Sequence, residues 1–137
     1  MSLGIDSRGL FEHVMATIQS WPPSKERCDA AKKSCDTLEQ QIRDMAVEIG
    51  VDYNRIENDA KGLRARERGD DILQALNYLS VFTEEGDSRI NNNEHKSKYL
   101  SGVQYFVIVS REYLSRRMET ADYYASHPEE LEKILKG

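Results

Sequence analysis

The sequence predicts an all-α protein: a helical bundle of four to five helices, with two long amphipathic helices over about residues 24–49 and 93–125. Apolar residues recur at three- and four-residue spacings over much of the chain, which is the period of an amphipathic helix. The 137 residues include only three prolines and eight glycines, so long segments run without a helix breaker. We expect a single domain over residues 1–137, large enough to bury a core.

The first helix is expected to begin at Asp6 or Ser7, because either side chain can cap it. It should end after Trp21, since Pro22 disfavours helical geometry in the residue before it. Its apolar positions are four residues apart with their immediate neighbours, as in a helix that faces a core. These positions are Leu10, Phe11, Val14, Met15 and Ile18.

The second helix has the clearest boundaries in the sequence. Ser24 is a suitable N-cap, and Gly50 follows the last apolar residue, where a left-handed residue commonly ends a helix. Between them, seven residues alternate by three and four positions and form a seam that packs along a neighbouring helix. The seam consists of Cys28, Ala31, Cys35, Leu38, Ile42, Met45 and Ile49. The sequence leaves open whether that neighbour belongs to the same chain or to a second one.

The two cysteines of the chain, Cys28 and Cys35, both lie in this seam. Seven helical residues span about 10.5 Å along the axis. A disulfide needs Cα atoms within about 7 Å, so the pair cannot close within its own helix. No further cysteine or histidine lies nearby to complete a metal site. Both are therefore predicted to be buried apolar side chains, with a redox or cross-chain role as the alternative.

A third helix is predicted to open at Val51 and Asp52, with Ile56, Ala60 and Leu63 as its apolar positions. We expect a break or kink near Gly69, after which the apolar pattern resumes as far as Phe82. Residues 83–93 are rich in Gly, Asp, Ser and Asn and are predicted to be a loop. A short last helix should follow Ser126, its cap, with Pro128 in the first turn.

The long helix over 93–125 carries one apolar stripe and an unusual second face. The stripe consists of Leu100, Val103, Val107, Leu114 and Ala121. The apolar run 105–109 could also be a buried strand, but the stripe continues on both sides of it, which favours helix. A helix that is apolar all round is either central in its bundle or covered by another chain. Tyr105, Ile108 and Val109 point away from the stripe and are therefore the predicted interface residues.

No pattern in the chain indicates catalysis, and we predict no enzyme, no catalytic residue, no metal ligand and no cofactor. The Gly-x-Ser-x-Gly, glycine-rich phosphate-loop and His-Glu-x-x-His motifs are absent. The Glu-x-x-His signature of di-iron bundles is absent at His13, His95 and His127. An active site assembled from distant carboxylates is the remaining enzymatic interpretation.

Charge and composition limit the partners. A net charge of −5 argues against nucleic acid, whose binding requires excess Lys and Arg. No apolar run approaches the roughly 20 residues of a membrane span. With two cysteines and no signal segment, a cytoplasmic protein is expected. Lys61, Arg64 and Arg68 share a helix side and form a possible anion-binding site, although interleaved acidic residues favour an ordinary solvated surface.

These observations lead to two functional hypotheses. The first is a non-enzymatic helical interaction or oligomerisation module, which forms a homo-oligomer, a dimer in the first place, or binds a helical protein partner. The second is a ligand-sensing or regulatory bundle that holds a small anionic or aromatic molecule between its helices. The residues proposed for that ligand are Tyr99, Tyr113, Tyr123, Tyr124 and Arg116 or Arg117.

Overall fold

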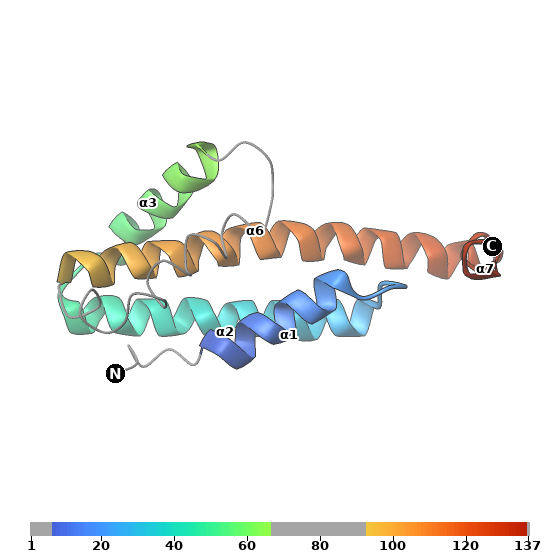
Figure 1. Cartoon of the computed structure of the whole chain (residues 1–137), viewed down its shortest axis with the longest axis horizontal. Coiled ribbons are helices and arrows are strands. Elements are labelled where there is room, and N and C mark those ends of the chain that lie inside the picture. Colours follow the sequence, from blue (N-terminus) through green and yellow to red (C-terminus); the bar gives the residue numbers. More distant parts are fainter. Residues whose placement is uncertain (1–6, 67–92, 137) are drawn as a thin grey trace.

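The computed structural model describes residues 7–66 and 93–136, which form five α-helices and no strand (Figure 1). The helices are α1 (Ser7–Gln19), α2 (Lys25–Ile49), α3 (Tyr53–Arg66), α6 (Asn93–Ser126) and α7 (Pro128–Lys136). The predicted all-α bundle is confirmed, and both long helices are within one residue of their expected bounds. The predicted break near Gly69, the apolar segment after it and all but the last residue of the predicted loop 83–93 lie outside the described residues, and Asn93 is the first residue of α6.

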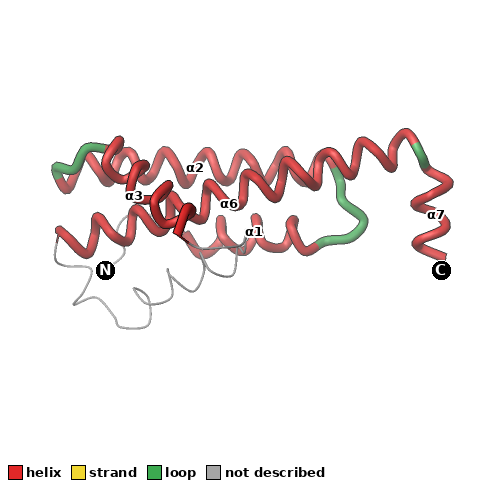
Figure 2. The backbone as a smooth tube through the Cα atoms, turned by 90° about the horizontal axis from the view of Figure 1, so that it is seen from above, coloured by secondary structure: helices red, strands yellow, loops and turns green. Residues whose placement is uncertain are grey.

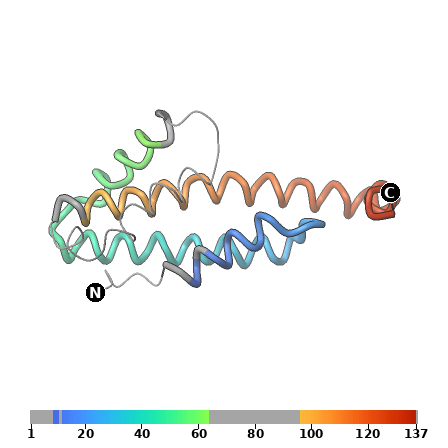
Figure 3. The backbone as a smooth tube through the Cα atoms, in the orientation of Figure 1, coloured from blue at the N-terminus to red at the C-terminus, as the bar shows by residue number. Residues whose placement is uncertain are grey.

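The two long helices, α2 and α6, lie side by side and run in opposite directions (Figures 1 and 3). Helix α1 packs on α2 and also contacts α6, and α3 packs on α6. Helix α6 continues past the start of α2, and α7 turns away from the axis of α6 at its end (Figures 1 and 2). None of the described helices combines the length and low polarity that a bilayer crossing needs.

Both predicted caps of α2 are present. The Ser24 side chain accepts a hydrogen bond from the Arg27 backbone N–H at 3.4 Å. Gly50 has a φ of +73°, in the left-handed region, and its N–H reaches the carbonyls of Ala46 and Val47. A residue with a Cβ is strained in this conformation, which explains why glycine ends the helix.

The seam of α2 is buried as predicted through its first five positions, from Cys28 to Ile42. Its last two positions differ, because Met45 and Ile49 are only half-buried and Ala46 is buried instead, with 1% exposed. The physical reason is that a straight α-helix has 3.6 residues per turn, so a strict seven-residue repeat drifts around its axis. The side of α2 that faces the core therefore shifts by one residue near its C-terminal end.

Helix α6 is the central helix of the bundle. The run 105–109 is helical, and the stripe residues Leu100, Val103, Val107 and Leu114 have no exposed surface. Between Ser97 and Ser110, every residue is buried except Lys98, which is exposed, and Ile108, which is half-buried. Other parts of the chain thus cover α6 on nearly every side over this segment, as expected for a central helix.

Three helix ends differ slightly from the predictions. Helix α1 ends at Gln19 instead of Trp21, where the Ser20 hydroxyl bonds the Thr17 carbonyl at 2.9 Å and competes with the helical pattern. Helix α3 begins at Tyr53, because the Asp52 carboxylate accepts the Asn54 N–H at 3.0 Å and precedes the helix as a cap. Ser126 is the last residue of α6 and does not cap α7.

Candidate functional site

Exposed apolar side chains gather at one end of the described structure. Of its five exposed large apolar residues, four lie where α6 outruns α2: Trp21 at 47%, Tyr123 at 47%, Ile134 at 51% and Leu135 at 58%. The fifth, Val47, lies near the other end of α2. We call Trp21, Tyr123, Tyr124 and the apolar side of α7 the C-terminal surface.

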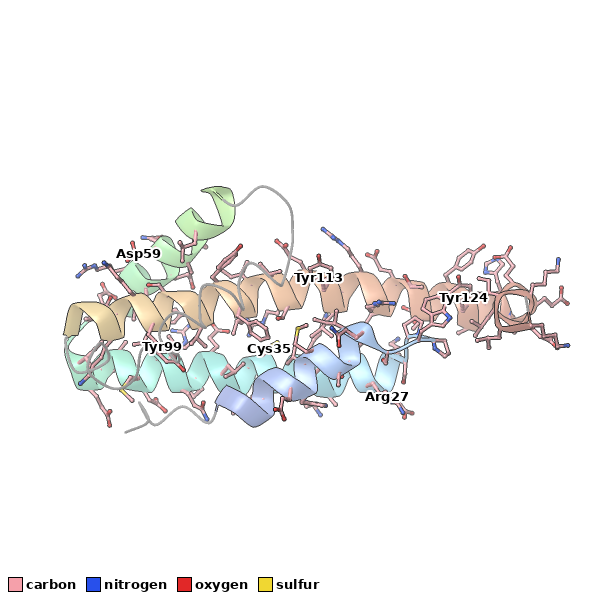
Figure 4. The ribbon with its side chains drawn as sticks, viewed as in Figure 1. Arg27, Cys35, Asp59, Tyr99, Tyr113 and Tyr124 are labelled. Atoms are coloured by element: carbon pink, nitrogen blue, oxygen red, sulfur yellow. The ribbon has the colours of Figure 1, made fainter. Side chains whose placement is uncertain are left out.

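Aromatic contacts hold the first part of the C-terminal surface together. The loop between α1 and α2 places the Trp21 ring edge-on to Tyr124, with ring centroids 5.8 Å apart. Tyr123 packs edge-to-face on Tyr124 at 5.5 Å and stacks on His127 at 4.3 Å. Figure 4 shows Tyr124 at the end of α6 that carries α7, far along the helix from Tyr99. Edge-to-face and stacked rings fix one another's orientation and leave partly exposed apolar faces.

Polar contacts attach α7 to the end of α6. The His127 Nδ1 atom lies 2.9 Å from the Tyr123 carbonyl oxygen, to which it donates. The Tyr123 hydroxyl donates to the Glu130 carboxylate, and this hydrogen bond raises the pKa of Tyr123. The Lys25 ammonium lies 3.5 Å from the Asp122 carboxylate and ties the start of α2 to the same region.

Helix α7 leaves its apolar side without cover from the described chain. Leu131, Ile134 and Leu135 have i, i+3 and i+4 spacing and therefore lie on one side of the helix. No residue of α7 is buried, and Leu131 alone among the described α7 side chains is half-buried. An apolar stripe on a helix usually faces a core, whereas this one faces solvent within the described structure.

A second cluster, of polar groups, lies between α2, α3 and α6. Arg111 contacts Asp36 at 2.6 Å and Glu39 at 2.5 Å. The Tyr53 hydroxyl lies 3.0 Å from Glu39 Oε1 and also 3.0 Å from Gln104 Oε1. Since a phenol has one proton, it donates to the charged Glu39, the stronger acceptor. The cluster joins the three helices through side chains that range from the buried Gln104 to the exposed Asp36.

The environment of this cluster fixes its protonation states. Burial would raise the pKa of Glu39, but the hydrogen bond and positive charge of Arg111 outweigh it and lower the pKa. Burial and the Glu39 carboxylate both raise the pKa of Tyr53. Burial would lower the pKa of Arg111, but the hydrogen bonds from its guanidinium to Asp36 and Glu39 outweigh this effect and raise the pKa of Arg111. Glu39 therefore stays ionised and Tyr53 stays protonated near neutral pH, and neither is poised to transfer a proton. The observed role of the cluster is to connect the three helices.

The cysteines are buried and unpaired. Cys28 has 1% exposed surface and Cys35 has none, and both thiols are free. Burial raises the pKa of Cys28, and it raises the pKa of Cys35 to about 11. A protonated, buried thiol is a weak nucleophile. Within the described ranges, no group of three or more His, Cys, Asp or Glu is arranged to hold a metal ion.

The other predicted site residues that the structure describes lie apart from the C-terminal surface. Tyr105 and Val109 are buried, with 1% and 0% exposed, and Ile108 is half-buried. Of these three predicted interface residues, Ile108 therefore has the most surface. In the possible anion-binding site, Lys61 pairs with Glu57 at 3.0 Å. The Arg64 side chain and all of Arg68 lie outside what the structure describes.

The tyrosines of the ligand hypothesis are distributed along α6 and do not line one pocket. Tyr99 is buried near its start, and Tyr113 is half-buried with the Arg116 guanidinium 5.7 Å from its ring. Only Tyr123 and Tyr124 contact each other. Two hollows in the described part of the chain, of about 220 and 320 Å³, have other linings. Residues of α1 with Ser20 and Arg27 line the first, and Ser126 to Glu130 line the second.

One pair that sequence reasoning missed has the spacing of a nucleophile and its base. His13 Nδ1 lies 2.7 Å from the Ser34 hydroxyl, which joins α1 to α2. Catalysis by such a pair also needs a group that orients the imidazole and donors for an oxyanion. Among the described residues no hydrogen bond orients the other His13 nitrogen, and Ser34 lies within a helix whose N–H groups are already engaged. No activity is assigned to the pair.

The C-terminal surface was also missed from the sequence, although a signal for it existed. The predicted lengths of the two long helices already differed, and at 1.5 Å per residue the longer one had to project past the shorter.

Comparison with known proteins adds no relative: no family model, no curated protein and no solved structure matches this chain.

Proposed function

We propose that this protein is a non-enzymatic interaction module that binds a helix of another protein chain through its C-terminal surface. The observation that carries the proposal is the gathering of Trp21, Tyr123, Ile134 and Leu135 at one end, each about half exposed. Monomeric proteins seldom leave large apolar side chains together on the surface, and such patches commonly mark interaction sites. Tryptophan and tyrosine are also among the residues that contribute most to binding energy.

The form of α7 supports a helical partner. A helix of nine residues is only marginally stable by itself in water, and it gains stability when its apolar side packs on another element. The stripe Leu131, Ile134 and Leu135 has the spacing with which amphipathic helices pack together. Helix α6 thereby extends beyond the bundle, and α7 at its end offers an apolar side on which a partner helix can pack.

A dimer contact and a cytoplasmic location are also proposed. The partner surface lies on α7 and the end of α6, and Ile108 on the flank of the central helix is a second, smaller contact that a dimer would use. We also propose a cytoplasmic location, because two buried thiols that remain unpaired are typical of a reducing compartment.

The test is site-specific photo-crosslinking in the cells that produce the protein. A benzophenone amino acid is placed at Ile134, and in a matched control at Glu48, which is exposed on α2 far from the C-terminal surface. We expect discrete higher-mass adducts from position 134 that are absent at position 48. Adducts absent from both positions, or identical at both, would contradict the proposal.

A further inference from the structure

The charges around the apolar stripe of α7 are arranged asymmetrically. Successive residues of an α-helix are rotated by about 100°. Relative to the middle of the stripe, Glu130 lies about a quarter turn to one side and Glu132 about a quarter turn to the other. Lys133 and Lys136 both lie on the opposite side of the helix. The apolar surface therefore has a carboxylate along each edge, and both lysines extend from the opposite side of the helix.

Neither flanking carboxylate is strongly neutralised within the chain. Glu130 accepts a hydrogen bond from the Tyr123 hydroxyl, which is a neutral donor and leaves the negative charge in place. Glu132 pairs with Lys136 at 2.6 Å, but the two side chains are 60% and 75% exposed. Ion pairs at that exposure contribute little and are readily exchanged for another cation.

From this arrangement we infer that the partner of the C-terminal surface is a cationic amphipathic helix, whose apolar stripe is flanked by Lys or Arg. The inference rests on the proposed function, since it names the partner of the same surface. Lysine or arginine at the edges of the incoming helix would lie opposite Glu130 and Glu132, as charged residues do at the edges of paired helices. A second copy of α7 would bring carboxylates against carboxylates, so charge disfavours self-association through this surface.

The size of the surface sets the expected affinity. The surface consists of one side of a nine-residue helix, Tyr123 bonded to its first turn, and Trp21 packed on Tyr124. We expect it to bury an area at the small end of specific interfaces. Such interfaces are transient and bind in the micromolar range. Part of that affinity should be electrostatic and should weaken between 50 and 300 mM salt, as ions screen exposed charges.

The test uses the full chain and two synthetic probes. One fluorescent peptide is an amphipathic helix with leucines at i, i+3, i+4 and i+7 and lysines along both edges, and the other has glutamates in place of the lysines. We expect the lysine peptide to bind at least tenfold more tightly by fluorescence anisotropy. Glu130→Gln with Glu132→Gln should reduce its affinity about fivefold, and Glu130→Lys with Glu132→Lys should make the glutamate peptide the better ligand.

Two controls separate charge from structure. Glu48→Gln with Glu129→Gln removes the same number of charges from outside the edges of the stripe and should leave the preference unchanged. Tyr123→Phe removes the hydrogen bond to Glu130 but keeps its carboxylate, so lysine-peptide binding should persist. Two results would overturn the electrostatic role. One is an equal loss of lysine-peptide affinity in the control pair, and the other is a loss in Tyr123→Phe as large as that in Glu130→Gln with Glu132→Gln.

The remaining outcomes distinguish this inference from the proposed function. If both peptides bind equally and Ile134→Ser with Leu135→Ser abolishes both, the surface is a binding site without charge selection, and only the inference fails. Failure of the lysine peptide to bind, with position 134 still crosslinking in cells, also overturns the inference alone. A molar mass of two chains by light scattering, abolished by the same serine pair, would identify a second copy as the occupant. Absence of all peptide binding and all crosslinks would overturn both.

Discussion

The polar cluster between α2, α3 and α6 gives the sharpest prediction about stability. Replacing Arg111 by methionine keeps much of the side-chain volume and removes the positive charge that pairs with Asp36 and Glu39. Glu39, with 19% of its side chain exposed, would then keep only the more exposed Arg43 guanidinium, 3.3 Å away on the same helix, as a counter-charge. We expect Arg111→Met to lower the free energy of unfolding at pH 7.

The magnitude follows from the burial of the two partners. Breaking a fully buried ion pair costs about 3–5 kcal/mol, and breaking an exposed one costs about 0.2–1 kcal/mol. Arg111 has 34% of its side chain exposed and Glu39 has 19%, so the pair lies between these limits. We therefore expect a loss of about 2 kcal/mol. Asp36 is 68% exposed, and Asp36→Asn should cost no more than about 0.5 kcal/mol.

The assay is urea denaturation followed by circular dichroism, with a double-mutant cycle of Arg111→Met and Glu39→Gln. A coupling free energy of about 1–2 kcal/mol is expected, because the two residues are in direct contact. The folded-state pKa of Glu39 is lowered, so its contribution is present above the unfolded pKa of about 4.3 and is lost as pH falls through the folded value. The difference between wild type and Arg111→Met should shrink below about pH 4.

Two results would refute this reasoning. A coupling free energy near zero would mean that solvent already screens the pair. A difference between wild type and Arg111→Met that stays constant from pH 7 to pH 3 would mean that methionine destabilises the protein through packing and not through the lost charge.

Three further predictions concern the core, the end of α2 and the thiols. Leu38→Ala should destabilise the protein by about 2–5 kcal/mol in urea melts, since Leu38 has no exposed surface; a cost below 1 kcal/mol would contradict its central place in the core. Gly50→Ala should lower the free energy of unfolding by about 1 kcal/mol through backbone strain alone, because nothing lies within 4 Å of the added Cβ. Gly50→Asn should lower it less, since asparagine tolerates the left-handed region better, and equal losses for the two variants would point to a cause other than strain. Cys35, with a pKa raised to about 11, should react with a thiol reagent at pH 8 far more slowly in the native protein than in urea, and equal rates would mean that the site opens readily.

The apolar second face of α6 illustrates how the same pattern can fit two structures. Tyr105 and Val109 were predicted to contact another chain, and they are buried within this one. The sequence indicates that the face is apolar but not what covers it. A buried face needs apolar residues whether the covering helix belongs to the same chain or to a partner. Helix α6 contacts α1, α2 and α3, and these contacts lie between residues far apart in the sequence.

The sequence by itself determined the helices. Their period, the cap at Ser24 and the left-handed residue at Gly50 depend on interactions within a few residues, and such local preferences can be read directly from the chain. The tertiary structure decided which apolar side chains remain exposed. Trp21 meets Tyr124 across about a hundred residues, and Ile134 stays uncovered because α6 carries α7 beyond the reach of α2. Exposure is a property of the packed arrangement, so the C-terminal surface became visible only once the helices were placed.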